Sequence, residues 1–158
     1  MKKAGFLNKL EKIGKLQIIE PSEAIKESYT EKSESNLVSA KILLENNKLE
    51  EAVALTYYSM YHMLTALLFR AGIKCENHIG SIMLLHEIFS IDNSEIEKAK
   101  KERVDKQYYT DFSIAKEEVG QAIKSAEKSN QKLLDFISKL NNKTIEDYRN
   151  KLKLLLKE

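Results

Sequence analysis

The segment Lys100–Phe112, with the sequence KKERVDKQYYTDF, holds the residues best suited to chemistry on a phosphate. The guanidinium of Arg103 is always charged, and its fork of donors matches a phosphate. An arginine followed a few residues later by a histidine would suit cleavage of an RNA phosphodiester, because histidine titrates near neutral pH. Here Tyr108 and Tyr109 stand in that place, with Asp105 between them and the arginine. A tyrosine with an ordinary pKa near ~10 is a weak base at neutral pH, although its hydroxyl can hydrogen-bond a phosphate.

A second set of polar residues interrupts the most apolar stretch of the chain. Tyr58 and His62 are one helical turn apart and therefore share a face, and Tyr61 is adjacent to His62. In so apolar a helix these polar groups need partners, either within the core or across an interface. His78 follows Gly72, a predicted helix stop, and is expected on a loop. Arg70 precedes that glycine, so its spacing from His78 does not imply proximity.

Each candidate has a structural interpretation beside the chemical one. Arg103 could form surface ion pairs with Glu102 or Asp105, while the neighbouring tyrosines pack at a helix junction. The polar groups of the apolar stretch could hydrogen-bond only within the core or a dimer seam. His78 could be a capping or surface histidine.

Helices must position all of these residues. The chain has one proline and five glycines among 158 residues, and no alternation with period two predicts a strand. The pattern predicts a single all-α domain over residues 1–158, an up-and-down antiparallel bundle with a buried central helix and short extra helices at both termini. The expected segments are 6–13, 22–45, 49–71 as the buried helix, 81–90, a surface helix capped by Asp92 or Asn93, 110–140, and a last helix capped by Thr144.

Composition limits the classes of function. With 26 basic and 24 acidic residues the net charge is +2, so any nucleic-acid contact must be local. The single Cys75 excludes an intrachain disulfide and favours a reducing, cytoplasmic setting. Three scattered histidines and the lack of a glycine-rich phosphate loop predict no metal and no cofactor. Residues 52–69 are nearly long enough to cross a membrane, but the polar residues at their middle favour a core helix.

Three runs of sequence, in this order, resemble one known family. They are AVALTYYSMYHMLTALLFRAGIKCENHIGSI, ERVDKQYYTDF and EEVGQAIKSAEKSNQKLLDFI. Together they resemble the HEPN family (higher eukaryotes and prokaryotes nucleotide-binding domain), in particular a small stand-alone bacterial and archaeal branch. The resemblance covers about residues 30–140. The matching positions are Tyr57–Tyr58, Tyr61–His62, Gly72, His78, Arg103 and Tyr108–Asp111.

The resemblance implies a helical bundle that often forms dimers. Many members are RNA-cleaving toxins or act beside a minimal nucleotidyltransferase. Active members carry an arginine, then four to six residues, then a histidine, in a cleft at the dimer seam. This chain departs from that pattern, because Tyr108, Tyr109 and Thr110 occupy the positions where the histidine would stand.

We therefore expect a homodimeric module associated with a nucleotide or RNA, paired with a nucleotidyltransferase in a toxin–antitoxin-like system. One alternative is an active, metal-independent ribonuclease that uses Arg103 with Tyr109 or His78. The other alternative is a dimeric interaction scaffold without a ligand. Arg103 and Tyr109 are the candidates for catalysis. The candidates for nucleotide or RNA binding are Arg103, Tyr108, Tyr109, Asp105, His78, Tyr58, Tyr61 and His62.

Overall fold

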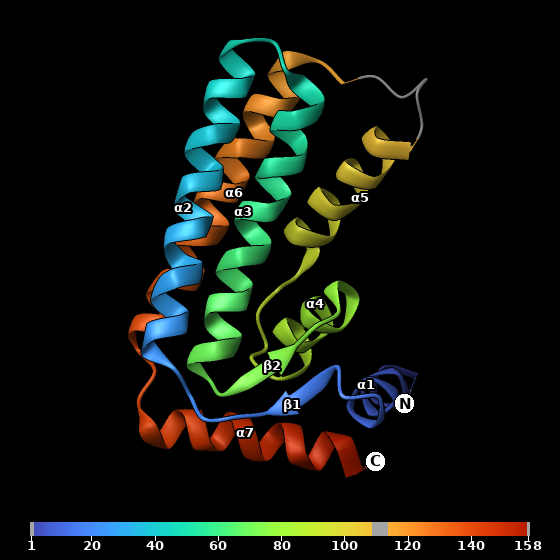
Figure 1. Cartoon of the computed structure of the whole chain (residues 1–158), viewed down its shortest axis with the longest axis vertical. Helices are drawn as coiled ribbons and strands as arrows, with labels where there is room; N and C mark the ends of the chain where they lie inside the picture. Colours follow the sequence, from blue (N-terminus) through green and yellow to red (C-terminus); the bar gives the residue numbers. More distant parts are fainter. Residues whose placement is uncertain (1, 109–113, 158) are drawn as a thin grey trace.

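The computed structural model describes residues 2–108 and 114–157 and confirms the all-α bundle (Figure 1). The long helices α2 (Glu23–Glu45), α3 (Leu49–Arg70) and α6 (Lys116–Ser138) pack side by side, and α5 (Ser94–Tyr108) leans against α3. In chain order α2, α3, α5 and α6 alternate in direction, as an up-and-down bundle requires. The other helices gather at one end of the bundle: α1 (Lys2–Lys12), α4 (His78–Glu87) and α7 (Asn142–Lys157).

Helix α3 is the central element of the core. Tyr57, Leu64 and Leu67 are fully buried, and the helix packs against α2, α5 and α6. By length and composition α3 could also cross a membrane, since an 18-residue window has a mean hydropathy of 1.2. Of that window, 61% is buried within the bundle, which is how the core helix of a helical domain behaves.

The structure contains two short strands that the sequence did not predict. Strands β1 (Leu16–Ile18) and β2 (Ile73–Cys75) pair antiparallel, with Leu16 opposite Cys75 and Ile18 opposite Ile73. Three residues are too few to show an alternating pattern, so the expectation of no strand was wrong for a simple reason of length. Gly72 makes this pairing possible. Its φ is 76°, and a Cβ at this position would lie 2.6 Å from the carbonyl oxygen of Ile19.

Helix α4 starts earlier than the sequence indicated. Residues 73–80 were expected as a loop and 81–90 as a helix, but α4 begins at His78 and ends at Glu87. The side chain of Asn77 caps it by accepting a hydrogen bond from the backbone N–H of Gly80 at 2.8 Å. His78 is therefore the first residue of a helix and not a loop residue, which fixes its backbone.

The other helices agree with the predicted pattern except at their ends. Asp92, one of the two predicted caps of α5, accepts from the backbone N–H of Ser94 at 3.2 Å. Helix α6 begins at Lys116, while residues 110–113 of the predicted helix lie outside the described part of the chain. Thr144 does not cap α7 from outside. Asn141 accepts from the N–H of Thr144 at 2.9 Å, and the Thr144 hydroxyl accepts in turn from the N–H of Asn141.

Candidate functional site

Side chains from three helices meet at the middle of α3. Tyr57 and Tyr58 both lie beside Tyr61 on α3, because positions three and four apart in a helix lie on the same face. His78 joins them from the first turn of α4, and Arg103 from α5. We call these five residues the histidine–tyrosine cluster. It unites polar residues that lie up to 46 positions apart in the sequence, from position 57 to position 103.

Two tyrosines hold the ring of His78. The hydroxyl of Tyr57 and Nδ1 of His78 share a hydrogen bond of 2.7 Å. The ring of Tyr61 stacks on the imidazole with 3.9 Å between centroids and 10° between planes. The Tyr61 hydroxyl is held in turn by the Ser81 hydroxyl at 3.2 Å. The imidazole is thus fixed both in its plane and in its rotation, as in a pre-organised site.

Arg103 lies over the tyrosine rings. The carbon at the centre of its guanidinium is 5.3 Å from the ring centroid of Tyr57 and 5.4 Å from that of Tyr58, within the range of cation–π attraction. Asp105, which the sequence offered as its ion-pair partner, binds Lys101 at 3.3 Å. Its contacts with the rings of Tyr57 and Tyr58 make the charge of Arg103 part of the cluster.

The surroundings of His78 keep its ring neutral. Burial lowers its pKa, and the positive charges of Arg103 and Lys100 lower the pKa further. Its place at the N-terminus of α4 acts in the same direction, because the helix dipole disfavours a cation there. Burial also raises the pKa of Tyr57, so this hydroxyl stays protonated at neutral pH. Burial raises the pKa of Tyr61 as well.

His62 lies beside the cluster but is bound to α2. Its Nδ1 accepts a hydrogen bond of 2.9 Å from the amide of Asn36, and its ring lies 5.7 Å from that of Tyr29. It also faces Tyr58, at 6.2 Å, as the spacing predicted. Burial lowers the pKa of His62, and the charges of Lys32 and His78 add to the effect. His62 therefore extends the aromatic surface toward α2.

The remaining candidates fall elsewhere. Arg70 forms an ion pair with Glu23, which agrees with the expectation that it would not meet His78. Tyr109 lies outside the described residues, and so does the side chain of Tyr108. Sequence reasoning missed the role of Tyr57, although its spacing of four from Tyr61 places both on one face. Within the described part of the chain, no three His, Cys, Asp or Glu side chains converge as metal ligands.

A second polar group on α3 faces the opposite direction. The Ser33 hydroxyl donates to the carbonyl of Ser59 at 2.7 Å, and the Ser59 hydroxyl donates to the carbonyl of Ser33 at the same distance. The amide of Asn130 donates to the Ser59 hydroxyl at 2.9 Å. This Ser33–Ser59–Asn130 network is buried and ties α2, α3 and α6 together. Its hydrogen bonds stay within the core, so it stabilises the fold.

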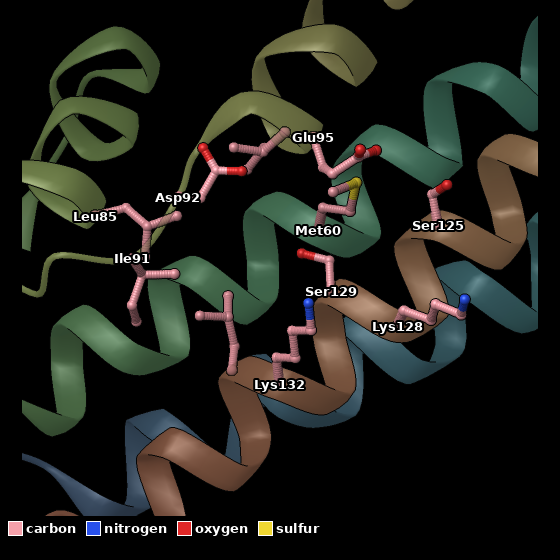
Figure 2. A pocket seen from close by; sticks show the side chains of 11 residues that line it. Met60, Leu85, Ile91, Asp92, Glu95, Ser125, Lys128, Ser129 and Lys132 are labelled. Atoms are coloured by element: carbon pink, nitrogen blue, oxygen red, sulfur yellow. The ribbon is translucent and has the colours of Figure 1, made fainter.

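A groove follows the other side of α5. Two neighbouring hollows of about 400 and 260 Å³ share Met60, Glu95 and Ser125. Figure 2 shows the larger one, with Asp92 and Glu95 on one side and Lys128 and Lys132 on the other. Neither hollow is lined by Tyr57, His78 or Arg103. The groove and the histidine–tyrosine cluster thus belong to different faces of α5.

Comparison with known proteins places this arrangement in one family. The model of the HEPN domain matches residues 27–130, which include every member of the histidine–tyrosine cluster. The segments α1, β1 and α7 lie outside the matched region.

Two relatives are archaeal proteins. A UPF0332 protein of Pyrococcus horikoshii is 41% identical over 58 residues, which cover 37% of this chain and 41% of that protein. A protein of Methanocaldococcus jannaschii with the name "Putative toxin" is 31% identical over 108 residues, which cover 64% of this chain and 80% of that protein. The chain therefore spans less than half of the first relative and most of the second.

Proposed function

The chain belongs to the HEPN domain family, and on this premise we propose that it is a toxin-type module that binds RNA, with Arg103 holding a backbone phosphate. The observation that carries the proposal is the position of Arg103 over the rings of Tyr57 and Tyr58, beside His78. The similarity to an archaeal protein named as a toxin supports the biological role.

Charge supports phosphate as the ligand. The whole chain has a net charge of only +2, yet the positive charges of Arg103 and Lys100 both act on His78. Lys32 lies 5.0 Å from the ring of Tyr29 on the neighbouring part of the surface. A local basic site on a nearly neutral protein favours a specific contact with phosphate over general attraction to nucleic acid.

The aromatic rings favour single-stranded RNA over a duplex. Tyr58, Tyr61 and His62 are half-buried, so part of each residue lies at the surface. Unpaired bases stack on such rings, and each stacked base contributes about 1–3 kcal/mol. A duplex keeps its bases stacked internally and offers them no comparable contact.

The test is binding of a labelled single-stranded RNA by the wild type, Arg103→Ala and Lys101→Ala. Lys101 is the matched control, since it is an exposed cation on the same helix that pairs with Asp105 outside the cluster. We expect Arg103→Ala to weaken binding about tenfold or more, because a hydrogen bond to a charged group contributes about 1.5–3 kcal/mol. Lys101→Ala should retain the affinity. Equal affinities of the wild type and Arg103→Ala would contradict the proposal and favour the scaffold.

A homodimer and a nucleotidyltransferase partner belong to the same proposal. Dimers are the commonest homo-oligomers, and the family resemblance implies both features. Sedimentation should give twice the chain mass of 18.2 kDa at micromolar concentration. A nucleotidyltransferase encoded beside this gene should form a complex that co-purifies when the two are co-expressed. A monomer mass would contradict the first feature, and the lack of a complex would contradict the second.

RNA cleavage is the second candidate function. The spacing after Arg103 offers no histidine, which argued for a binding module without a base. One observation favours cleavage nonetheless: His78 and Arg103 both contact Tyr57. An arginine and a histidine do lie together, although they come from different helices.

A further inference from the structure

The groove between α5 and α6 is large enough to hold a small molecule. Its larger hollow has a volume of about 400 Å³, within the range of about 300–1,000 Å³ that is usual for ligand pockets. The second hollow, of about 260 Å³, continues the groove past Met60 and Ser125 toward Glu102. The histidine–tyrosine cluster lies on the other face of α5, so the proposed contact with RNA does not account for this groove.

The apolar residues that line the larger hollow belong to the core. Met60, Leu85, Ile96 and Leu133 come from four different helices, and each exposes 4% or less of its surface. Because close packing holds such side chains in place, this lining keeps its shape without a ligand. An apolar ligand that covered these residues would leave water for an apolar surface, which favours binding.

The two walls of the larger hollow carry opposite charges. Glu95, in the first turn of α5, lies on one wall, while Lys128 and Lys132 of α6 lie on the other (Figure 2). Among the residues that the structure describes, none of these three side chains forms an ion pair or a hydrogen bond. On another face of α6, by contrast, Glu127 pairs with Lys41 at 3.1 Å. Opposite charges therefore face each other across an apolar floor without pairing.

The charges of the two walls define the polar groups that a ligand needs. Asp92 lies on the same wall as Glu95, but its two carboxylate oxygens accept hydrogen bonds from Ser94 at 3.2 and 2.6 Å. Glu95 is therefore the carboxylate left for a ligand, and an ammonium group suits it. Lys128 and Lys132 suit a carboxylate. A ligand that reaches both walls must carry both charges, on separate ends of one apolar body.

From these contacts we propose that the groove binds a small zwitterion with an apolar body, whose ammonium group contacts Glu95 and whose carboxylate contacts Lys128 and Lys132. A short peptide of apolar residues has this chemistry, because its charged termini stand at the two ends of an apolar body. The dipeptide leucyl-leucine is the probe for this class of ligand. The proposal does not rest on RNA binding by Arg103, and either one can fail without the other.

Calorimetric titration of the full chain with leucyl-leucine tests the proposal. We expect a dissociation constant below about 1 mM, from the binding energy per atom that is usual for drug-sized ligands. The N-acetyl form of the peptide lacks the ammonium charge and the C-terminal amide form lacks the carboxylate. Each should bind about two- to fivefold more weakly, because ion pairs at exposed positions contribute little. Glycyl-glycine keeps both charges without the apolar body and should not bind measurably.

Two variants of the protein match the two modified peptides. Glu95→Gln should weaken binding of leucyl-leucine about two- to fivefold and leave the affinity for the N-acetyl form unchanged, since that form has no ammonium charge to lose. Lys132→Gln should do the same with the amide form. Glu97→Gln and Lys124→Gln are the matched controls. Both residues are exposed charges on the same two helices, and neither lines the groove, so both variants should bind as the wild type does.

NMR spectra locate the bound peptide. Addition of leucyl-leucine should shift the backbone amide signals of Ser125 and Ser129, which line the groove on α6. The absence of both heat and amide shifts at millimolar peptide overturns the proposal. Equal affinity for the three leucine peptides overturns the assignment of the charges, and so does wild-type affinity for leucyl-leucine in both Glu95→Gln and Lys132→Gln. Shifts confined to residues outside the groove overturn its location.

Discussion

Helix α3 carries two polar regions, and the polar groups of each find their partners in different surroundings. The Ser33–Ser59–Asn130 network is buried, and its donors find acceptors on α2, α3 and α6. The histidine–tyrosine cluster begins two residues earlier, at Tyr57, but faces α4 and α5. Only Tyr57 of this cluster is fully buried, while Tyr58, Tyr61, His78 and Arg103 are partly exposed.

The difference lies in where the polar atoms are directed. A buried hydrogen-bond network stabilises one arrangement of helices and leaves little for a ligand. The histidine–tyrosine cluster is instead partly exposed at Tyr58, Tyr61, His78 and Arg103, which leaves part of its polar surface for a ligand. Pattern alone does not separate the two regions, because both interrupt the same apolar helix. Burial and bonding partners separate them, so substitutions in the two regions should affect different measurements.

Tyr57→Ala should have the largest effect on stability, since Tyr57 belongs to the cluster but is fully buried, as the residues of the core are. Truncation of a fully buried aromatic side chain costs about 3–5 kcal/mol of unfolding free energy. Urea denaturation followed by circular dichroism measures this loss. Tyr57→Phe is the control that keeps the ring, and an equally large loss in that variant would show that the hydroxyl and not packing dominates.

Asn130→Ala should lower the free energy of unfolding by less than Tyr57→Ala does, and it should affect only the buried network. It removes the donor to Ser59 and leaves buried hydroxyls with fewer partners, which costs about 1–3 kcal/mol. RNA affinity should stay at the wild-type value when measured well below the melting temperature. Weaker RNA binding by the folded variant would mean that the two regions are coupled through α3.

Arg103→Ala should have a smaller effect on the free energy of unfolding. Its contacts with the rings of Tyr57 and Tyr58 are cation–π interactions, each about 0.5–1 kcal/mol at a partly exposed site. The change in urea midpoint should therefore be less than for Asn130→Ala, although RNA binding falls. A stability loss as large as that of Tyr57→Ala would make Arg103 a core residue in energetic terms.

The smallest expected effect is a dependence of stability on pH. The pKa values of His78 and His62 are lowered in the folded protein, so between the folded and unfolded values the unfolded chain binds more protons. Their contribution to stability is complete above the unfolded pKa of about 6.5. It falls as pH drops below that value and levels off under the folded pKa values. Urea midpoints from pH 7.5 to 5 measure this effect, and His78→Asn should show a shallower decline.

The sequence predicted the helices because long amphipathic and apolar patterns depend on local spacing. It predicted that Tyr58 and His62 share a face for the same reason. It missed β1 and β2, whose three-residue pairing depends on segments far apart in the chain. It also placed His78 on a loop, although Asn77 immediately before it is a favourable N-cap residue.

The main part of the site could not be derived from spacing. The meeting of His78 with Arg103 depends on how α4 and α5 pack on α3, which no local pattern encodes. The structural alternative, surface ion pairs of Arg103 with Glu102 or Asp105, stays a prediction, and Asp105 forms an ion pair with Lys101 at 3.3 Å. The expected roles of Tyr108 and Tyr109 remain predictions, because the former's side chain and the latter residue lie outside the described part of the structure.

The contact between Gly80 and Leu10 indicates that the site depends on residues outside the region 27–130 that the family model matches. A Cβ at position 80 would lie 2.5 Å from the Leu10 side chain, so the first turn of α4 rests directly on α1. Leu10 lies before residue 27, where the family match begins. A fragment trimmed to residues 27–130 would keep Tyr57, His78 and Arg103 but lose the support against which His78 is aligned. The region that the family model matches is therefore smaller than the region that supports the site. Transfer of the site into another HEPN protein would require helix α1 of this chain as well.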